Sequence, residues 1–170
     1  MKAIVYTQYG PPDVLQLMEV AKPEPKEDQV LVKVHAASVN ALDSRRFEKL
    51  SVMGRLMEER FINSAGKILG ADIAGRVEAI GASVKKFQPG DEVFGVAAGS
   101  KGGFSEFACA AEDHLALKPS NLSFDAAAAV PVAGLTALQG LRDKGQIQPG
   151  QKVLINGASG GVGTFAVQIA

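Results

Sequence analysis

The sequence predicts a mixed β and α/β fold, in which a barrel-like all-β domain precedes the first unit of a parallel α/β sheet. Short β-rich runs separated by glycine and proline fill roughly the first 120 of the 170 residues. From Ser123 onward the pattern becomes alanine-rich and helical. A buried-strand pattern, a glycine cluster and an apolar helix pattern then follow one another over residues 152–170. We expect the two domains to cover residues 1–122 and 123–170.

The β-rich part contains several runs with strand character. At residues 29–34, Val30, Val32 and Val34 share one face, which is the period-two pattern of a strand. Glycine and proline between the runs are typical of tight turns. The predicted strands cover residues 3–7, 14–20, 29–34, 71–80, 92–96, 104–110 and 115–118.

One segment of this part has helical spacing. Apolar residues recur at three- and four-residue intervals over residues 52–61. We interpret this stripe as a helix face packed against the core, with a cover over a substrate pocket as the alternative.

The second part begins with helix signals. Ser123 is a candidate N-cap, and Pro131 suits the first position of a second helix that should end at Gly145. Residues 152–156 (KVLIN) are predicted to form a buried strand, and residues 164–170 the opening of a helix. A parallel sheet needs a further strand and a crossover, so we expect the rest of this domain to lie beyond this sequence or in a partner.

Composition argues against several classes of protein. The 18 basic and 18 acidic residues give a formal net charge of zero, which disfavours nucleic acid as a partner. No uncharged apolar stretch approaches the ~18 residues of a membrane-spanning helix, and the first residues lack a secretory signal. The single cysteine, Cys109, cannot form an intramolecular disulfide, and we interpret it as a small apolar residue in a strand. We expect a cytoplasmic protein without a membrane span.

The glycine cluster at residues 156–163 (NGASGGVG) is the most informative segment. Glycines between a strand and a helix let the backbone turn tightly, so that the first N–H groups of the helix face outward with a partial positive charge. Such a turn can hold a pyrophosphate. In the G-x-G-x-x-G frame the three positions fall on Ala158, Gly160 and Gly163, so the first glycine is replaced.

Two other interpretations of this segment stay open. Residues 157–161 also satisfy G-x-S-x-G, in which Ser159 would be the nucleophile of an α/β-hydrolase. Those enzymes place their acid and histidine after the serine, whereas His35 and His114 both precede it. A glycine turn without any ligand is the second alternative.

Residues 150–168 (GQKVLINGASGGVGTFAVQ) resemble the signature of quinone oxidoreductases, the zinc-free, zeta-crystallin-like branch of the medium-chain dehydrogenase/reductase superfamily. Four further segments resemble that family in the same order: MKAIVYTQYGPPDVLQL, VLVKVHAASVNALD, GADIAGRVEAIGASVKKFQPGDEVFG and AAAAVPVAGLTALQGL. The resemblance implies a GroES-like β-barrel over residues 1–122. Linking helices and the start of a truncated, nucleotide-binding Rossmann domain would follow over residues 123–170.

The resemblance also bears on metal content. Zinc alcohol dehydrogenases of the superfamily have cysteine where this chain has Asn40, and Gly-His-Glu where it has Gly70, Ala71 and Asp72. An amide and a methyl group do not replace a thiolate and an imidazole as zinc ligands, so we expect no metal site. Hydride transfer to a conjugated acceptor needs hydrogen-bond donors for its carbonyl oxygen rather than a metal.

Individual roles are implied in the same way. Asn40 should lie beside the nicotinamide and the substrate, and Asp43 should orient that loop; these two are the expected catalytic residues. An ion pair of Asp43 with Arg45 or Arg46 is the alternative.

Further positions are implied for the cofactor and the substrate. Thr136 should contact the nicotinamide side of the cofactor, or else bond within its own helix. Tyr9 or Tyr6 is a candidate donor to a substrate carbonyl, with ring packing as the alternative. The residues expected to hold the pyrophosphate are Ser159, Gly160, Gly161, Val162 and Gly163.

These expectations describe NADPH-dependent reduction of quinones or α,β-unsaturated carbonyl compounds without zinc, with NADH as the alternative cofactor. We expect a small-molecule substrate, a homodimer at full length, and no activity from these 170 residues alone. A relative of zinc-type alcohol dehydrogenases and a non-catalytic binding module stay open as alternatives.

Overall fold

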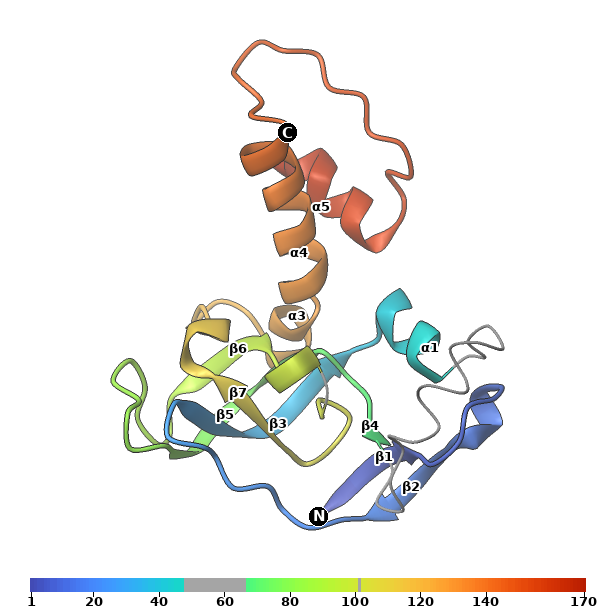
Figure 1. Cartoon of the computed structure of the whole chain (residues 1–170). Helices are drawn as coiled ribbons and strands as arrows, with labels where there is room; N and C mark the ends of the chain where they lie inside the picture. Colours follow the sequence, from blue (N-terminus) through green and yellow to red (C-terminus); the bar gives the residue numbers. More distant parts are fainter. Residues whose placement is uncertain (48–66, 101) are drawn as a thin grey trace.

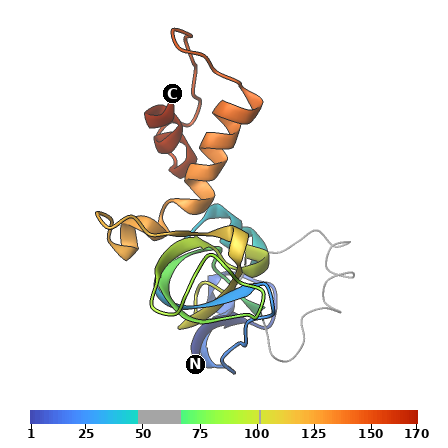
Figure 2. The ribbon, with the colours of Figure 1, turned by 90° about the vertical axis from the view of Figure 1, so that its left-hand side faces the viewer.

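The computed structural model of the chain describes residues 1–47, 67–100 and 102–170 (Figure 1). The strands form one body, and two helices, α4 (Pro131–Leu138) and α5 (Gly161–Ile169), project from it (Figure 2). The apolar stripe predicted at residues 52–61 lies outside the described residues.

The strands form two antiparallel sheets. The smaller has the order β2 (Leu15–Glu19), β1 (Lys2–Tyr6), β4 (Lys67–Ile68). The larger has the order β7 (Phe107–Ala111), β3 (Gln29–Ser38), β5 (Asp72–Ile80), β6 (Glu92–Val96), β8 (Leu115–Leu117). Every run predicted in the β-rich part is confirmed as a strand with small shifts at its ends, whereas β4 was not predicted.

The predicted β-barrel is not closed among the described residues. Strand β1 approaches the segment before β7 through one isolated bridge, between Ala3 and Ser105. Ser105 lies in a bend, where its hydroxyl oxygen is 2.6 Å from the carbonyl oxygen of Gly102 and 2.8 Å from that of Phe107. The bend prevents a continuous ladder of hydrogen bonds, and the two sheets stay separate.

The main hydrophobic core lies against the larger sheet. Val30 and Val32 are fully buried, as the alternation in residues 29–34 predicts, but Leu31 on the other face is buried as well. The buried members of this core are Val30, Val32, Ile73, Val77, Val84, Phe87, Val93, Ala97, Ala108, Ala110 and Leu115. A second cluster packs α1 (Ala41–Phe47) near the smaller sheet, through Tyr6, Val14, Phe47 and Leu69.

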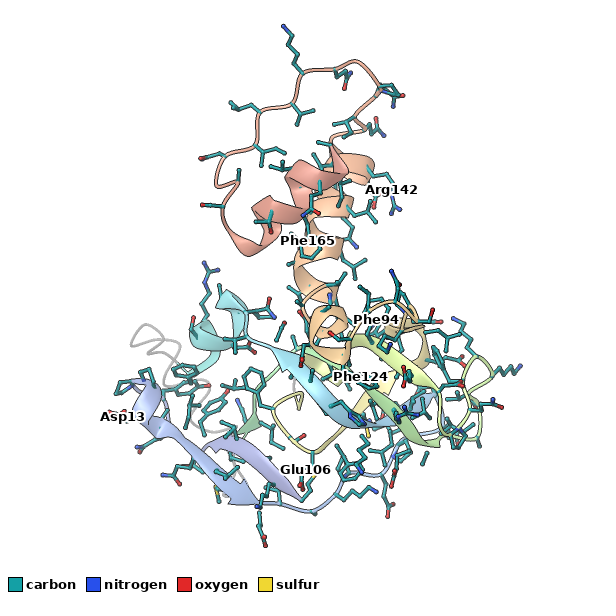
Figure 3. The ribbon with its side chains drawn as sticks, turned by 180° about the vertical axis from the view of Figure 1, so that it is seen from behind. Asp13, Phe94, Glu106, Phe124, Arg142 and Phe165 are labelled. Carbon is teal, nitrogen blue, oxygen red and sulfur yellow. The ribbon has the colours of Figure 1, made fainter. Side chains whose placement is uncertain are left out.

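The helix signals after residue 122 are confirmed. The Ser123 hydroxyl accepts a hydrogen bond from the N–H of Ala126 (3.2 Å), capping α3 (Phe124–Ala128). Pro131 is the first residue of α4, which continues as a wide π-helical stretch, Gln139–Lys144, and stops at Gly145. Helix α3 packs on the larger sheet, where Phe94 and Phe124 both pack against the buried alanines of the contact (Figure 3).

The predicted buried strand at residues 152–156 is wrong for this structure. These residues have no regular structure, and the Leu154 side chain is 96% exposed. A parallel strand is held by hydrogen bonds to a neighbouring strand, and no neighbour exists for it among the described residues. In the described ranges, no helix is long and apolar enough to span a bilayer.

The pairing of β3 with β5 can be tested at Gly75. A Cβ at this position would lie 2.1 Å from the carbonyl oxygen of Lys33. Since that backbone oxygen can move only if the strands part, we expect Gly75→Ala to lower the free energy of unfolding by about 2–3 kcal/mol, measured by chemical denaturation.

Gly140→Ala is the matched control, because nothing lies within 4 Å of the Cβ that it would add. This change should leave the free energy of unfolding unchanged or raise it by up to about 1 kcal/mol. Equal effects of the two changes would contradict the described pairing.

Candidate functional site

A buried carboxylate lies where the two central strands of the larger sheet meet the helices. Asp72, the first residue of β5, pairs with Ser38, the last residue of β3, and has no exposed surface. Its Oδ2 atom accepts hydrogen bonds from the Ser38 hydroxyl (3.0 Å) and from the Asn40 side-chain amide (3.1 Å). The register of β3 and β5 therefore sets the position of the predicted catalytic residue Asn40.

Asp72 also connects the sheet to α4. Its Oδ1 atom accepts a hydrogen bond from the N–H of Val132 (3.1 Å) in the first turn of that helix, where the N-cap, Val130, offers no side-chain acceptor. Burial raises the pKa of Asp72, while the hydrogen bonds from Asn40, Ser38 and Val132 oppose that rise. A carboxylate from the sheet thus caps the helix that leads out of the β-rich part.

Asp43, the other predicted catalytic residue, binds backbone groups. It is 2% exposed; its Oδ2 atom accepts from the N–H of Asn40 (2.8 Å) and its Oδ1 atom from the N–H of Gly70 (3.1 Å). Gly70 has a φ of +93°, and a Cβ there would lie 2.6 Å from the nitrogen of Phe104, so only glycine fits. Among the described side chains Asp43 forms no ion pair. Its contacts hold the loop of Asn40 against the start of β5.

Thr136 lies one helical turn after Val132. Its hydroxyl donates to the carbonyl oxygen of Val132 (2.6 Å), which is the alternative that the sequence left open, and its side chain is exposed. The hydroxyl oxygen can still accept a hydrogen bond. Asp72, Val132 and Thr136 therefore form one line that runs from the sheet along α4.

The glycine cluster forms a tight bend at the start of α5. The N–H of Gly160 donates to the carbonyl oxygen of Gly157 (3.0 Å), and Gly157 has a φ of +74°. A Cβ at Gly163 would lie 2.1 Å from the same oxygen, so the bend requires glycine there. The predicted start of the helix at residue 164 falls three residues late.

The first turn of α5 has no cap from its own residues. The N-cap, Gly160, has no side chain, and in the described part of the chain no group accepts from the N–H groups of Gly161, Val162 and Gly163. Ser159, also predicted to touch the cofactor, is exposed in the bend. An uncapped helix start of this kind fits an anion such as the pyrophosphate of NADPH.

Tyr9 is half-buried beside Tyr6, with ring centroids 6.1 Å apart. It packs on the cluster that contains Phe47 of α1. The ring packing that the sequence left as an alternative is therefore present, and a role in substrate binding stays a prediction.

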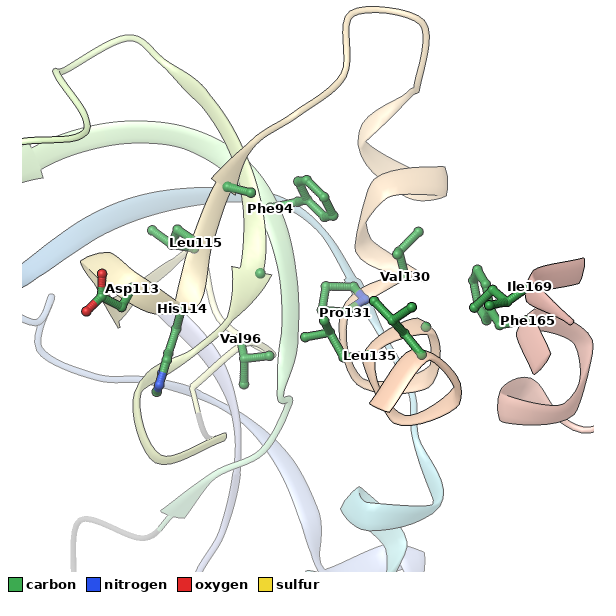
Figure 4. Close-up of a pocket in the computed structure, with 14 residues that line it drawn as sticks. Phe94, Val96, Asp113, His114, Leu115, Val130, Pro131, Leu135, Phe165 and Ile169 are labelled. Carbon is green, nitrogen blue, oxygen red and sulfur yellow. The ribbon is translucent and has the colours of Figure 1, made fainter. Parts of the chain in front are cut away.

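A cavity of about 730 Å³ lies between strands β6 and β8 and helices α4 and α5 (Figure 4). Phe94, Val96 and Leu115 line it from the strands, and Phe165 and Ile169 from α5. None of the predicted site residues lines it. The cavity is therefore distinct from the cluster around Asn40 and Asp72.

The donor set does not fit a zinc ion. Ala71 has no donor atom, and the Asn40 amide and the Asp72 carboxylate already bond to each other. Within residues 1–47, 67–100 and 102–170, no three His, Cys, Asp or Glu side chains gather as metal ligands would.

The nucleophile interpretation of Ser159 also lacks its base. The His35 ring stacks on Phe124, with centroids 4.5 Å apart, and His114 is exposed in the turn before β8. Neither histidine bonds to Ser159 among the described residues.

The structure brings Asn40 and Asp43 together but adds three residues that the sequence analysis missed: Ser38, Asp72 and Val132. Asp72 carries a usable signal, because it is the one charged residue in the apolar run ILGADIAG. A lone acid in a predicted buried strand indicates a carboxylate that must find donors.

The role of Asp43 can be tested by stability. Asp43→Ala leaves two backbone N–H groups without their acceptor, so we expect the free energy of unfolding to fall by about 2–4 kcal/mol. Asp43→Asn keeps one acceptor oxygen and should lose about half as much. Chemical denaturation measures both, with Asp13→Ala as an exposed control at about 0.5 kcal/mol or less. Equal losses at positions 13 and 43 would refute the assignment.

Comparisons with known proteins agree with this architecture. Residues 26–120 match the family model described as "Alcohol dehydrogenase GroES-like domain". The chain is 41% identical to the 2-methylene-furan-3-one reductase of Solanum lycopersicum over 179 residues, and 41% identical to the quinone oxidoreductase of Sus scrofa over 171 residues. It is 38% identical to the NADPH-dependent alkenal/one oxidoreductase of Arabidopsis thaliana over 178 residues.

All of this chain aligns with these three relatives, but only 44%, 49% and 44% of their own lengths. The solved structure of the quinone oxidoreductase from Coxiella burnetii is 38% identical, with a TM-score of 0.87 over 99% of this chain and 52% of that protein. The chain thus spans about half the length of the relatives that it matches. Because the family model matches more than half of the 170 residues, the chain belongs to the alcohol dehydrogenase GroES-like domain family, and the predicted resemblance to quinone oxidoreductases is confirmed.

Proposed function

We propose that the full-length protein reduces quinones or α,β-unsaturated carbonyl compounds with NADPH, without zinc. The uncapped glycine bend at the start of α5 carries this proposal, because it offers backbone N–H groups to a pyrophosphate and no side chain crowds Gly161. The names of the relatives supply the substrate class and the cofactor.

The residues of this chain would bind and orient the reactants. The N–H groups of Gly161, Val162 and Gly163 would hold the pyrophosphate, and the exposed Thr136 hydroxyl oxygen would accept from the nicotinamide side. Asp43 and Asp72 hold Asn40 in place between the sheet and α4. NADPH bound there would supply a hydride, and water would supply the proton that completes the reduction.

An assay of the full-length protein tests the proposal. We expect NADPH to be oxidised with quinones and with conjugated enones but not with simple saturated ketones, as followed by the absorbance of the reduced nicotinamide. The rate should be unchanged after treatment with a strong zinc chelator. The 170-residue chain alone should be inactive, because it spans about half the length of its relatives and residues 152–156 pair with no strand among the described residues.

Each contrary result has a distinct meaning. If no acceptor leads to oxidation of NADPH, the proposed enzyme activity is refuted and a non-catalytic binding module is favoured. Loss of activity with the chelator, restored by added zinc, would favour a zinc-type alcohol dehydrogenase.

Substitutions at two glycines of the bend distinguish an effect on NADPH binding from an effect on folding. Gly160 has an extended backbone (φ −79°, ψ 169°), and a Cβ there would meet only the oxygen of Gly157, at 3.4 Å. Gly160→Ala should therefore fold normally but place a methyl group where the pyrophosphate approaches. We expect the NADPH dissociation constant to rise about 10–100-fold, measured by calorimetry on the full-length protein.

Gly163→Ala should instead lower the melting temperature, because its Cβ would collide with the oxygen of Gly157 at 2.1 Å. If Gly160→Ala binds NADPH as tightly as the unchanged protein, the pyrophosphate does not lie at this bend.

A further inference from the structure

Asp72, Ser38 and Asn40 form a closed triangle of hydrogen bonds. The Ser38 hydroxyl donates to Asp72 Oδ2 (3.0 Å), Asn40 Nδ2 donates to the same oxygen (3.1 Å), and Asn40 Nδ2 also donates to Ser38 Oγ (3.2 Å). The N–H of Val132 donates to the remaining oxygen, Oδ1 (3.1 Å). Four donor contacts therefore converge on two acceptor residues.

When Asp72 is ionised, one arrangement of hydrogens satisfies this triangle. An ionised carboxylate only accepts, so both Ser38 and Asn40 must donate to Asp72. The Ser38 hydrogen is then used, and its oxygen can accept the second hydrogen of the Asn40 amide. A flipped Asn40 amide would place its carbonyl oxygen against the carboxylate, where no hydrogen lies between them.

Both N–H groups of Asn40 are thereby spent inside the protein. Its carbonyl oxygen, Oδ1, has no partner among the described residues, and the residue is half-buried. The amide that the sequence analysis expected to offer donors and an acceptor can offer only the acceptor.

We propose that Asp72 is a positioning residue that locks Asn40 as a hydrogen-bond acceptor, so that Asn40 binds a donor group of the bound reactants rather than a carbonyl oxygen. The donor is an amide NH₂ or a hydroxyl; the cofactor carries groups of both kinds, whereas the acceptor molecule supplies a donor only where it bears a hydroxyl substituent. This assignment of a ligand group rests on the proposed function, whereas the locking of the amide does not.

Hydrogen exchange at the side chain tests the lock directly. In the full-length protein labelled with ¹⁵N, we expect both Asn40 amide hydrogens to exchange with solvent at least about tenfold more slowly than those of the exposed Asn121. Exchange at Asn40 as fast as at Asn121 would overturn the proposal even in an active enzyme. Slow exchange in a protein that binds no NADPH would refute the proposed function alone.

Asp72→Asn should reverse the orientation of the Asn40 side-chain amide. The backbone N–H of Val132 can only donate, so it bonds to the carbonyl oxygen of the new amide at position 72. The NH₂ group of that amide then faces Asn40. Asn40 must then flip and present its own NH₂ outward. We expect its exchange to approach that of Asn121 and the affinity for the bound donor to fall about 10–100-fold.

Two kinetic readouts distinguish the source of the donor. A higher dissociation constant for NADPH with an unchanged KM for the quinone assigns the donor to the cofactor. An unchanged NADPH affinity, with kcat or KM altered for a quinone that bears a hydroxyl group, assigns it to the acceptor molecule. Unchanged values for both, within about twofold, would overturn the proposal.

Two control experiments distinguish the proposed role of Asp72 from a general loss of structure. Asp125→Asn removes an exposed acid of α3 and should change none of these values. In an Asn40→Ala background, Asp72→Asn should have no further effect on affinity, whereas the same loss in both backgrounds would overturn the proposal.

If Asp72→Asn fails to fold, Ser38→Ala tests whether both amide hydrogens of Asn40 are bonded inside the protein. It removes the acceptor of one Asn40 hydrogen only, so one of the two should exchange rapidly and the other slowly. Equal rates for the two hydrogens in this variant would overturn the proposal.

Discussion

The buried charge of Asp72 is the constraint around which the candidate site is arranged. An ionised carboxylate without exposed surface is destabilising by several kcal/mol unless donors surround it. Its donors come from the end of β3, from the loop of Asn40 and from the first turn of α4. Because each donor belongs to a different segment, a shift of any one leaves a buried charge partly unpaired. The sheet, the loop and the helix therefore hold their positions together.

The glycine bend, in contrast, is stabilised by interactions between residues that are close in sequence. Helix α5 makes its hydrogen bonds within itself, and the contact of Gly163 with the oxygen of Gly157 shapes the turn over a few residues. The segment before it needs a neighbouring strand, and at residues 152–156 none is present. The bend at the helix start can thus form although residues 152–156 pair with no strand among the described residues.

The same distinction explains what the sequence could predict. Alternation in residues 29–34 and the cap at Ser123 are local patterns, and the structure follows both. Closure of the barrel depended on the bend at Ser105, and β4 has too few residues to show any period. The site was predicted as single residues, Asn40 and Asp43, because their positions could be read from a resemblance. Their link to Asp72 depends on the register of β3 with β5 and on the approach of α4, which no local pattern contains.

The combined charge at positions 40 and 72 differs between this chain and the zinc alcohol dehydrogenases. In the zinc alcohol dehydrogenases of the superfamily, cysteine occupies the position of Asn40 and glutamate that of Asp72, and both of these side chains can carry a negative charge. Without the metal, a thiolate beside a buried carboxylate would leave two like charges unscreened. An amide removes one of the charges and gives the other a donor, as the 3.1 Å contact between Asn40 and Asp72 shows. Asparagine at this position thus gives the buried carboxylate a donor without adding a second negative charge, and the same contact leaves the carbonyl oxygen of Asn40 to face a ligand.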